Sequence, residues 1–338
     1  MTFFPGILPQ LRIALCPATR LANRFRSCAR RGVRTWLRIL ISALVLGWLL
    51  ARFDLRATLA ECAGTNLWLF LAAFAFYLAS QLASALRWSR LARAIGFRAP
   101  FGRCAKIYLT GMFFGMVAPS TLGSDATRVI YLGSEPPGRA RALPSVLFDR
   151  VVGLVILIAI GAAAIALGPS SSLPRGLSAT LALAGAAITA AWFAAPIAVK
   201  LLPRDFRLRR LVEGELAPYW RDPGVLAISC VLSLLVHGLQ IVSQKLLASA
   251  LGLEVSLGFV AIYHPLVTIS AALPLTIGGF GLREAAYAYL LPFAGVGERA
   301  AIALGLLWFL VGALGGLTGG AVYAFSDLQG ARELESRG

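Results

Sequence analysis

The chain has 338 residues, of which 58% are hydrophobic and only 14% are charged, and its mean hydropathy is +0.77. Soluble domains carry about 25% charged residues, so this composition excludes a soluble globular protein and predicts an integral membrane protein. Basic residues outnumber acidic residues by 32 to 15, but they lie between apolar runs, where they set topology and contact anionic headgroups. We therefore expect no nucleic-acid partner.

The five cysteines show no paired spacing and only two histidines are present. This pattern predicts neither a disulfide framework nor a zinc site, and we expect no metal and no cofactor.

Six apolar runs are long enough, or nearly long enough, to cross a bilayer as a helix of about 20 residues. They are 37–52, 67–86, 150–167, 177–200, 225–251 and 300–325. The arginine-rich segment 1–36 is expected to be a cytoplasmic tail, as is 326–338, and 37–325 is expected to form one transmembrane domain. The predicted fold is an all-α polytopic membrane protein.

Two further apolar stretches are interrupted. Residues 107–118 would give about 18 Å of helix against a hydrocarbon core of about 30 Å. Residues 257–294 are long enough to span, but prolines and glycines interrupt them. The interrupting residues are Pro265, Pro274, Gly278, Gly279, Gly281 and Pro292.

The distribution of basic residues orients these segments. Residues 1–36, 87–106 and 200–224 are rich in Arg and Lys and are expected inside, whereas 168–176 and 252–258 are nearly free of them and are expected outside. The stretches 107–149 and 259–299 must then each enter and return on one side. The prediction is six crossings plus two re-entrant hairpins, with both termini cytoplasmic.

The two interrupted stretches resemble each other at a constant offset of 155 residues. Tyr108 matches Tyr263, Pro119 matches Pro274 and Arg128 matches Arg283; Thr121 with Thr276 and Gly123 with Gly278 also coincide. Three predicted crossings lie between the copies, which turns the second copy upside down. Inverted repeats with broken helices are typical of transporters. The alternative is chance similarity between two kinks rich in glycine and proline.

Each hairpin combines a helix start with an arginine, an arrangement that suits a phosphate group. In the first hairpin Ser120, Thr121 or Ser124 could cap the second half-helix, and Gly123 permits a turn. The predicted headgroup-binding residues are Ser120, Thr121, Gly123, Ser124, Asp125, Arg128, Asp149, Arg150, Thr276, Gly278, Gly279, Gly281, Arg283 and Glu284. The alternative is structural bracing, with Asp125 paired to Arg128, Asp149 to a neighbouring arginine and Arg283 to Glu284.

Three elements of the sequence resemble the lysylphosphatidylglycerol synthase transmembrane family. They are Pro119-Ser-x-x-Gly-x-Asp-x-x-Arg128, Ser145-Val-Leu-x-Asp149-Arg150-x-x-Gly153 and Pro274-x-x-x-Gly-Gly-x-Gly-x-Arg283-Glu284. The resemblance covers about residues 35–325 and implies a flippase-like protein of the inner membrane that handles anionic or glycosylated lipids, in some members linked to hopanoid or glycolipid pathways. Gly123-Ser124-Asp125 departs from the family's Gly-Gly-Asp. Only about a dozen residues follow Phe325, so the family's soluble aminoacyl-transferase activity is not expected.

The function that we expect is therefore a lipid flippase or lipid-transport protein, not an enzyme, with membrane lipids and a possible lipid-biosynthesis enzyme as partners. The alternatives are a non-catalytic membrane partner of a lipid-modifying enzyme, a membrane-embedded lipid-modifying enzyme, and a small-solute transporter. The acidic residues are scattered, which disfavours a metal-dependent enzyme.

Overall fold

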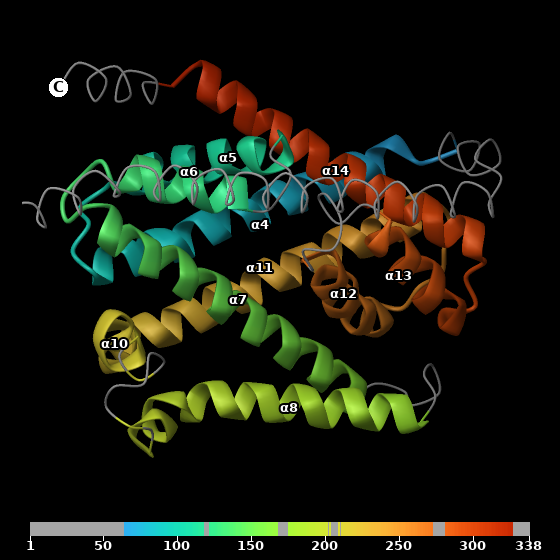
Figure 1. Cartoon of the computed structure of the whole chain (residues 1–338). Coiled ribbons are helices and arrows are strands. Elements are labelled where there is room, and N and C mark those ends of the chain that lie inside the picture. The colour runs from blue at the N-terminus through green and yellow to red at the C-terminus, as the bar shows by residue number, and fades with distance from the viewer. Residues whose placement is uncertain are drawn as a thin grey trace, which may run out of the picture.

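The computed structural model describes residues 64–117, 122–167, 175–201, 203, 209, 211–272 and 281–326. Within these ranges every element is helical (Figure 1) and no strand occurs. Five helices are long and apolar enough to cross a membrane. They are α4 (Leu67–Ala94), α7 (Arg139–Leu167), α8 (Arg175–Ala198), α11 (Pro223–Ala250) and α14 (Glu298–Ala324). The all-α polytopic fold is confirmed. The predicted span 37–52, the predicted tail 1–36 and all but Ser326 of the predicted tail 326–338 lie outside the described residues.

Both interrupted stretches contain pairs of short helices. The first pair is α5 (Phe101–Val117) and α6 (Leu122–Leu132); the second is α12 (Leu257–Ala272) and α13 (Leu282–Leu290), which continues into a 3-10 turn, η3 (Leu291–Ala294). Pro119, Ser120 and Thr121 lie outside the described residues, as do Pro274, Thr276, Gly278 and Gly279. The expectation that Pro265 interrupts its helix is wrong, because Pro265 lies inside α12.

Short elements connect α8 to α11. They are η1 (Val199–Leu201), η2 (Leu211–Glu215) and α10 (Ala217–Arg221). The side chain of Asp222 then caps α11 by accepting hydrogen bonds from the backbone N–H groups of Gly224 and Val225, and Pro223 occupies the first helical position, where its missing N–H is not needed.

Helices α4 and α11 form an antiparallel pair at the centre of the fold. The backbone N–H of Asn66 donates to the carbonyl oxygen of Ala250 (2.9 Å), and the hydroxyl of Ser243 donates to the carbonyl oxygen of Ala73 (2.7 Å). Further along the same two helices, Gln240 Nε2 donates to Ser80 Oγ (3.4 Å). Small residues and interhelical hydrogen bonds of this kind replace the hydrophobic effect as the cause of helix association in lipid.

This pairing places the two short-helix pairs at opposite ends of the molecule. Helix α5 follows the C-terminal end of α4, whereas α12 follows the C-terminal end of α11, and these ends are far apart because α4 and α11 are antiparallel (Figure 1). Three long helices, α7, α8 and α11, separate the two pairs in the chain. This placement is compatible with the predicted inverted repeat, which stays a prediction.

Glycines bring α14 against α5. A Cβ atom on Gly316 would lie 3.1 Å from the sulfur of Met116, and one on Gly320 would lie 2.8 Å from Cδ2 of Phe113. At Gly319 the backbone carbonyl of Leu109 occupies the space that a Cβ would need. These glycines therefore allow α14 and α5 to pack closely.

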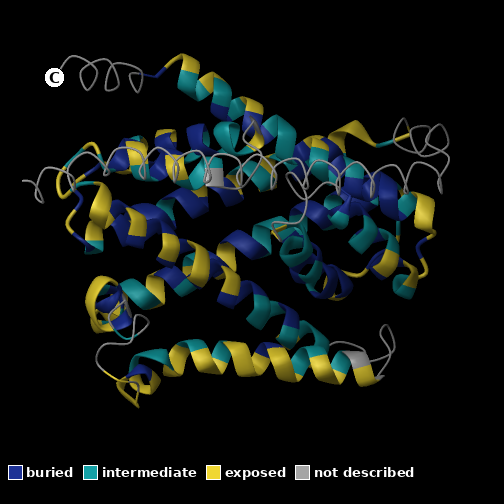
Figure 2. Cartoon of the chain, in the orientation of Figure 1, coloured by how far each residue is buried: buried dark blue, intermediate teal, exposed yellow. Residues whose placement is uncertain are grey.

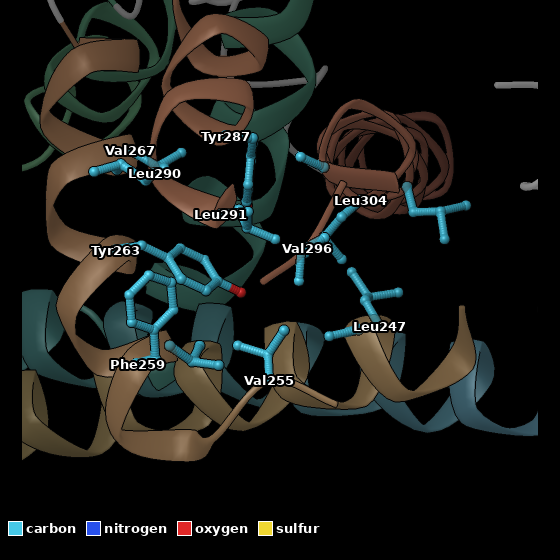
Figure 3. Packing of buried hydrophobic residues seen from close by; sticks show 14 of the residues in the cluster. Leu247, Val255, Phe259, Tyr263, Val267, Tyr287, Leu290, Leu291, Val296 and Leu304 are labelled. Carbon is cyan, nitrogen blue, oxygen red and sulfur yellow. The ribbon is translucent and has the colours of Figure 1, made fainter. Parts of the chain in front are cut away.

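Buried apolar side chains form two clusters. One lies around α12, α13 and the first half of α14 and includes Tyr263, Tyr287 and Leu304 (Figure 3). The other lies where α4 ends and α7 begins, around Trp88 and Phe148. Helix α8 packs on α7 and exposes most of its apolar surface (Figure 2), which is the surface that lipid chains would cover.

Candidate functional site

A group of charged side chains lies where α4, α6 and α7 meet, and we call it the first arginine centre; Arg87, Arg128 and Asp149 are buried, Asp125 is partly buried and Arg150 is exposed. Its members are Arg87, Asp125, Arg128, Asp149 and Arg150. The carboxylate of Asp149 accepts from Arg87 Nε through Oδ1 (2.7 Å) and from Arg128 Nη1 through Oδ2 (2.8 Å). The Asp149 side chain is only 2% exposed, so its charge is neutralised by two arginines and not by water.

Asp125 extends the centre toward the surface of α7. It accepts from Arg128 Nη2 through Oδ1 (2.8 Å) and from Arg150 Nε through Oδ2 (2.6 Å). Asp125 and Arg128 lie one turn apart on α6, and Arg150 is 41% exposed. The centre therefore contains three guanidinium groups and two carboxylates, and the charges of its members sum to one positive charge.

Arg128 is held on all sides but retains one unused donor. Its guanidinium carbon lies 5.4 Å from the centre of the Trp88 ring and 5.1 Å from that of Tyr108, both within cation–π range. The indole N–H of Trp88 in turn donates to Ser145 Oγ (3.3 Å). The Nε of Arg128 is buried and makes no hydrogen bond with another described group.

The prediction that Arg87 lies in a loop is wrong. The distribution of basic residues placed it in a cytoplasmic loop 87–106, but α4 continues to Ala94 and α5 begins at Phe101, so the connection is short. Arg87 is buried in α4 because Asp149 neutralises it and because its Nη1 donates to Ser233 Oγ of α11 (2.8 Å). A Cβ on Gly153 would lie 3.1 Å from Nη1 of Arg87, so the glycine makes room for the guanidinium.

The interrupted element predicted over residues 107–149 is shorter in the structure and ends before residue 139. Helix α7 begins at Arg139, so Asp149 and Arg150 lie inside a long helix and not at its start. Gly123 and Ser124 lie in the first turn of α6, so Gly123 forms no turn and Ser124 is not a cap. Ser124 instead packs on α5: a Cβ on Gly111 would lie 3.1 Å from the carbonyl oxygen of Ser124.

The second arginine centre consists of Gly281, Arg283 and Glu284 at the start of α13. Gly281 has φ of +84°, a conformation that favours glycine. Its backbone N–H donates to Glu284 Oε2 (2.8 Å), while Glu284 Oε1 accepts from Arg283 Nε (2.9 Å). The Arg283 guanidinium lies 5.2 Å from the centre of the Phe309 ring of α14. All of this centre is buried.

The pairs expected under the bracing alternative are therefore formed: Asp125 with Arg128, Asp149 with arginines, and Arg283 with Glu284. These contacts give each arginine a fixed position in the fold. Within the described residues no group of three or more His, Cys, Asp or Glu side chains is placed to hold a metal ion.

Sequence reasoning missed the participation of Arg87 and Ser233. The spacing of serines on α11 carries a signal for the latter, because Ser229 and Ser233 lie one turn apart and both are buried.

No curated protein matches the chain. The buried arginine centres carry the residues of the motifs noted above, and the long apolar helices make the chain a multi-pass membrane protein. The family model for the lysylphosphatidylglycerol synthase transmembrane region matches residues 35–320, and the chain belongs to that family.

Proposed function

We propose that this protein is a lipid flippase or lipid-transport protein of the cell inner membrane, and that it binds anionic or glycosylated lipid headgroups at its two arginine centres. The observation that carries the proposal is Arg128. This guanidinium is buried in a membrane domain, its Nε makes no hydrogen bond with another described group, and it belongs to a centre whose charges sum to one positive charge.

An uncompensated charge inside a membrane protein is costly, and such residues usually mark a substrate path. A phosphodiester carries one negative charge and oxygens that accept hydrogen bonds from guanidinium groups. It would place an anion beside the three guanidinium groups and an acceptor within reach of Arg128 Nε. The half-exposed Arg150, on the outer side of α7, offers a first contact for a headgroup approaching this centre.

The placement of the two hairpins supports transport in preference to binding alone. The first arginine centre belongs to the α5–α6 end of the molecule and the second to the α12–α13 end. We propose that both hairpins are re-entrant and that 1–36, the α4–α5 connection and 200–224 face the cytoplasm. Each leaflet would then have one headgroup site, so that a headgroup could enter the protein from either side.

The proposal is tested in liposomes that contain the purified protein and a fluorescent phosphatidylglycerol, with an impermeant reductant that bleaches only the outer leaflet. The wild-type protein is expected to make nearly all the label accessible, whereas Arg128→Ala and Arg283→Ala are expected to leave the inner-leaflet half protected. Arg221→Ala removes an exposed charge at the end of α10 and is the matched control, because it should exchange lipid at the wild-type rate.

Bracing is separated from binding by Arg128→Lys, which keeps the positive charge beside Asp149 but loses the planar, multiply donating group. A stable Arg128→Lys protein that exchanges label poorly supports headgroup binding. Normal exchange by a folded Arg128→Ala protein would refute it. The lipids recovered from the liposomes are expected to be chemically unchanged, and a modified lipid product would instead favour a lipid-modifying enzyme.

A further inference from the structure

Buried hydrogen-bonding groups occupy the middle of the domain, between the two arginine centres. They lie on α11 and α12, around His237, Gln244 and His264, and all three side chains are at most 8% exposed. His237 lies near the midpoint of the 28-residue helix α11, and hence at the depth where water is scarcest.

The hydrogen bonds of these side chains show which of their polar atoms make no bond with another described group. His237 Nε2 lies 3.0 Å from the carbonyl oxygen of Gly153. Only an N–H can bond a carbonyl, so this nitrogen is the donor and Nδ1 of His237 is an acceptor. Gln244 Nε2 lies 2.8 Å from His264 Nδ1; with the amide as donor, Nε2 of His264 carries the proton.

Three atoms at this place make no hydrogen bond with another described group: Nδ1 of His237, Nε2 of His264 and Oε1 of Gln244. Buried polar atoms are nearly always satisfied by protein or by ordered water, and a site for water needs two to four such partners. The His237 and His264 ring centres are 6.0 Å apart, so the unbonded atoms of the two rings lie in the same small region of the fold.

This polar group continues into the first arginine centre. Gly153, whose carbonyl oxygen bonds His237, also lies directly against the Arg87 guanidinium. Ser233, one turn before His237 on α11, accepts a hydrogen bond from Arg87 Nη1 (2.8 Å). Gly153 and Ser233 therefore provide a polar connection between Arg87 and His237.

It also continues toward the second arginine centre. Tyr263 lies in α12 and directly precedes His264 in the chain. Its ring centre lies 5.7 Å from that of Tyr287 on α13 (Figure 3). The hydroxyl groups of Tyr263 and Tyr287 are buried and make no hydrogen bond with other described groups. A Cβ on Gly305 would contact both Tyr287 (3.0 Å) and Glu284 (3.6 Å), so Tyr287 lies beside the second centre.

We propose that His237, Gln244, His264, Tyr263 and Tyr287 form a water-holding polar seam that joins the two arginine centres through the middle of the membrane domain. The groups of the seam are neutral donors and acceptors flanked by Arg87 at one end and by Arg283 and Glu284 at the other. Such a seam suits water and the hydroxyl groups of glycerol or sugar headgroups. Its use as the path of a moving headgroup rests on the proposed lipid transport, but its hydration does not.

Hydration is tested directly because the chain has only two histidines. Protein labelled with ¹⁵N-histidine and with ¹³C-methyl leucine and valine, purified through a histidine-free tag and placed in lipid bilayers, should give two imidazole spectra in solid-state NMR. Both rings are expected to receive magnetisation from water faster than the buried leucine and valine side chains do. Transfer as slow as that of the apolar core would overturn the seam.

A pair of double variants tests the passage. Gln244→Leu with His264→Phe removes both partners of one buried hydrogen bond and makes the place apolar, a change that can leave stability nearly unaltered. Its remaining histidine, His237, is expected to lose water contact, and lipid exchange is expected to be lost. Gln244→Asn with His264→Gln stays polar and is expected to retain water contact and exchange.

The two arms separate the two proposals. Hydrated histidines in a protein that exchanges no lipid would leave the seam standing and refute the lipid-transport function. Wild-type exchange by the folded apolar variant, or dry histidines in a protein that exchanges lipid, would refute the seam and leave the transport function standing.

Discussion

Replacement of Asp149 by asparagine tests how much the first arginine centre stabilises the fold. Asn keeps the size of the side chain and one acceptor oxygen, but it removes the charge that neutralises Arg87 and Arg128, whose donor nitrogens lie 2.7 and 2.8 Å from the carboxylate. Breaking a buried ion pair by removing one partner costs about 3–5 kcal/mol, because the other charge stays buried. Two guanidinium groups lose their partner here, so we expect a value in the upper part of that range.

The measurement is equilibrium unfolding in mixed detergent micelles, followed by circular dichroism, for wild type, Asp149→Asn and Glu213→Gln. Glu213 pairs with Arg209 at 2.9 Å, but its side chain is 41% exposed, and exposed pairs contribute about 0–1 kcal/mol. The same chemical change is thus made in a buried and in an exposed carboxylate. Equal losses of unfolding free energy in the two variants would refute the claim that Asp149 neutralises two dry arginines.

Three glycine substitutions give further predictions. Gly319→Ala places a Cβ against the backbone carbonyl of Leu109, so α5 and α14 must separate and we expect a strong loss of thermal stability. Gly238→Ala is the control, because its Cβ would meet nothing within 4 Å. This variant should be neutral or stabilising by up to about 1 kcal/mol. Gly281→Ala forces an L residue to adopt φ of +84°, which costs roughly 1–2 kcal/mol, and the unfolding midpoint should fall accordingly; an unchanged midpoint would show that α13 can begin in another conformation.

Long apolar helices were predictable from sequence because each signal is local. A run such as 225–251 has only one way to satisfy its backbone in lipid, and α11 is found there. Proline and glycine act on their own turn, so short helices were predictable in the stretches 107–118 and 257–294, where α5, α12 and α13 are found. Pro265 is the exception: it lies buried inside α12, where a Cβ on Gly161 of α7 would lie 3.0 Å from its ring.

The partners within the first arginine centre were only partly predictable. Asp125 and Arg128 lie one helical turn apart, so their pairing follows from spacing alone. Arg87 and Asp149 are 62 residues apart, and nothing local distinguishes an arginine that ends a span from one that is buried within it. The charge distribution placed Arg87 in a loop because that method counts charges and cannot see a carboxylate supplied by another helix.

The two hairpins share an architecture but differ in charge, and this difference gives a last prediction. Arg128 and Arg283 occupy matching positions, but Asp125 matches Phe280 and Glu284 matches Val129. The second centre is a compact Arg–Glu pair in which Glu284 already uses both oxygens. A phosphate at Arg283 must therefore compete with Glu284, whereas one at Arg128 meets a surplus of positive charge.

Glu284→Gln removes that competition while the amide oxygen can still accept from the Gly281 N–H. We expect an anionic headgroup to bind more tightly at the second centre and to leave it more slowly, so that exchange of phosphatidylglycerol slows while its affinity rises. Phosphatidylcholine, which has no net charge, serves as the matched lipid and should show a smaller change in affinity. Faster exchange of phosphatidylglycerol with unchanged affinity would show that Glu284 only braces α13, because a brace that is loosened should ease the motion without altering anion binding.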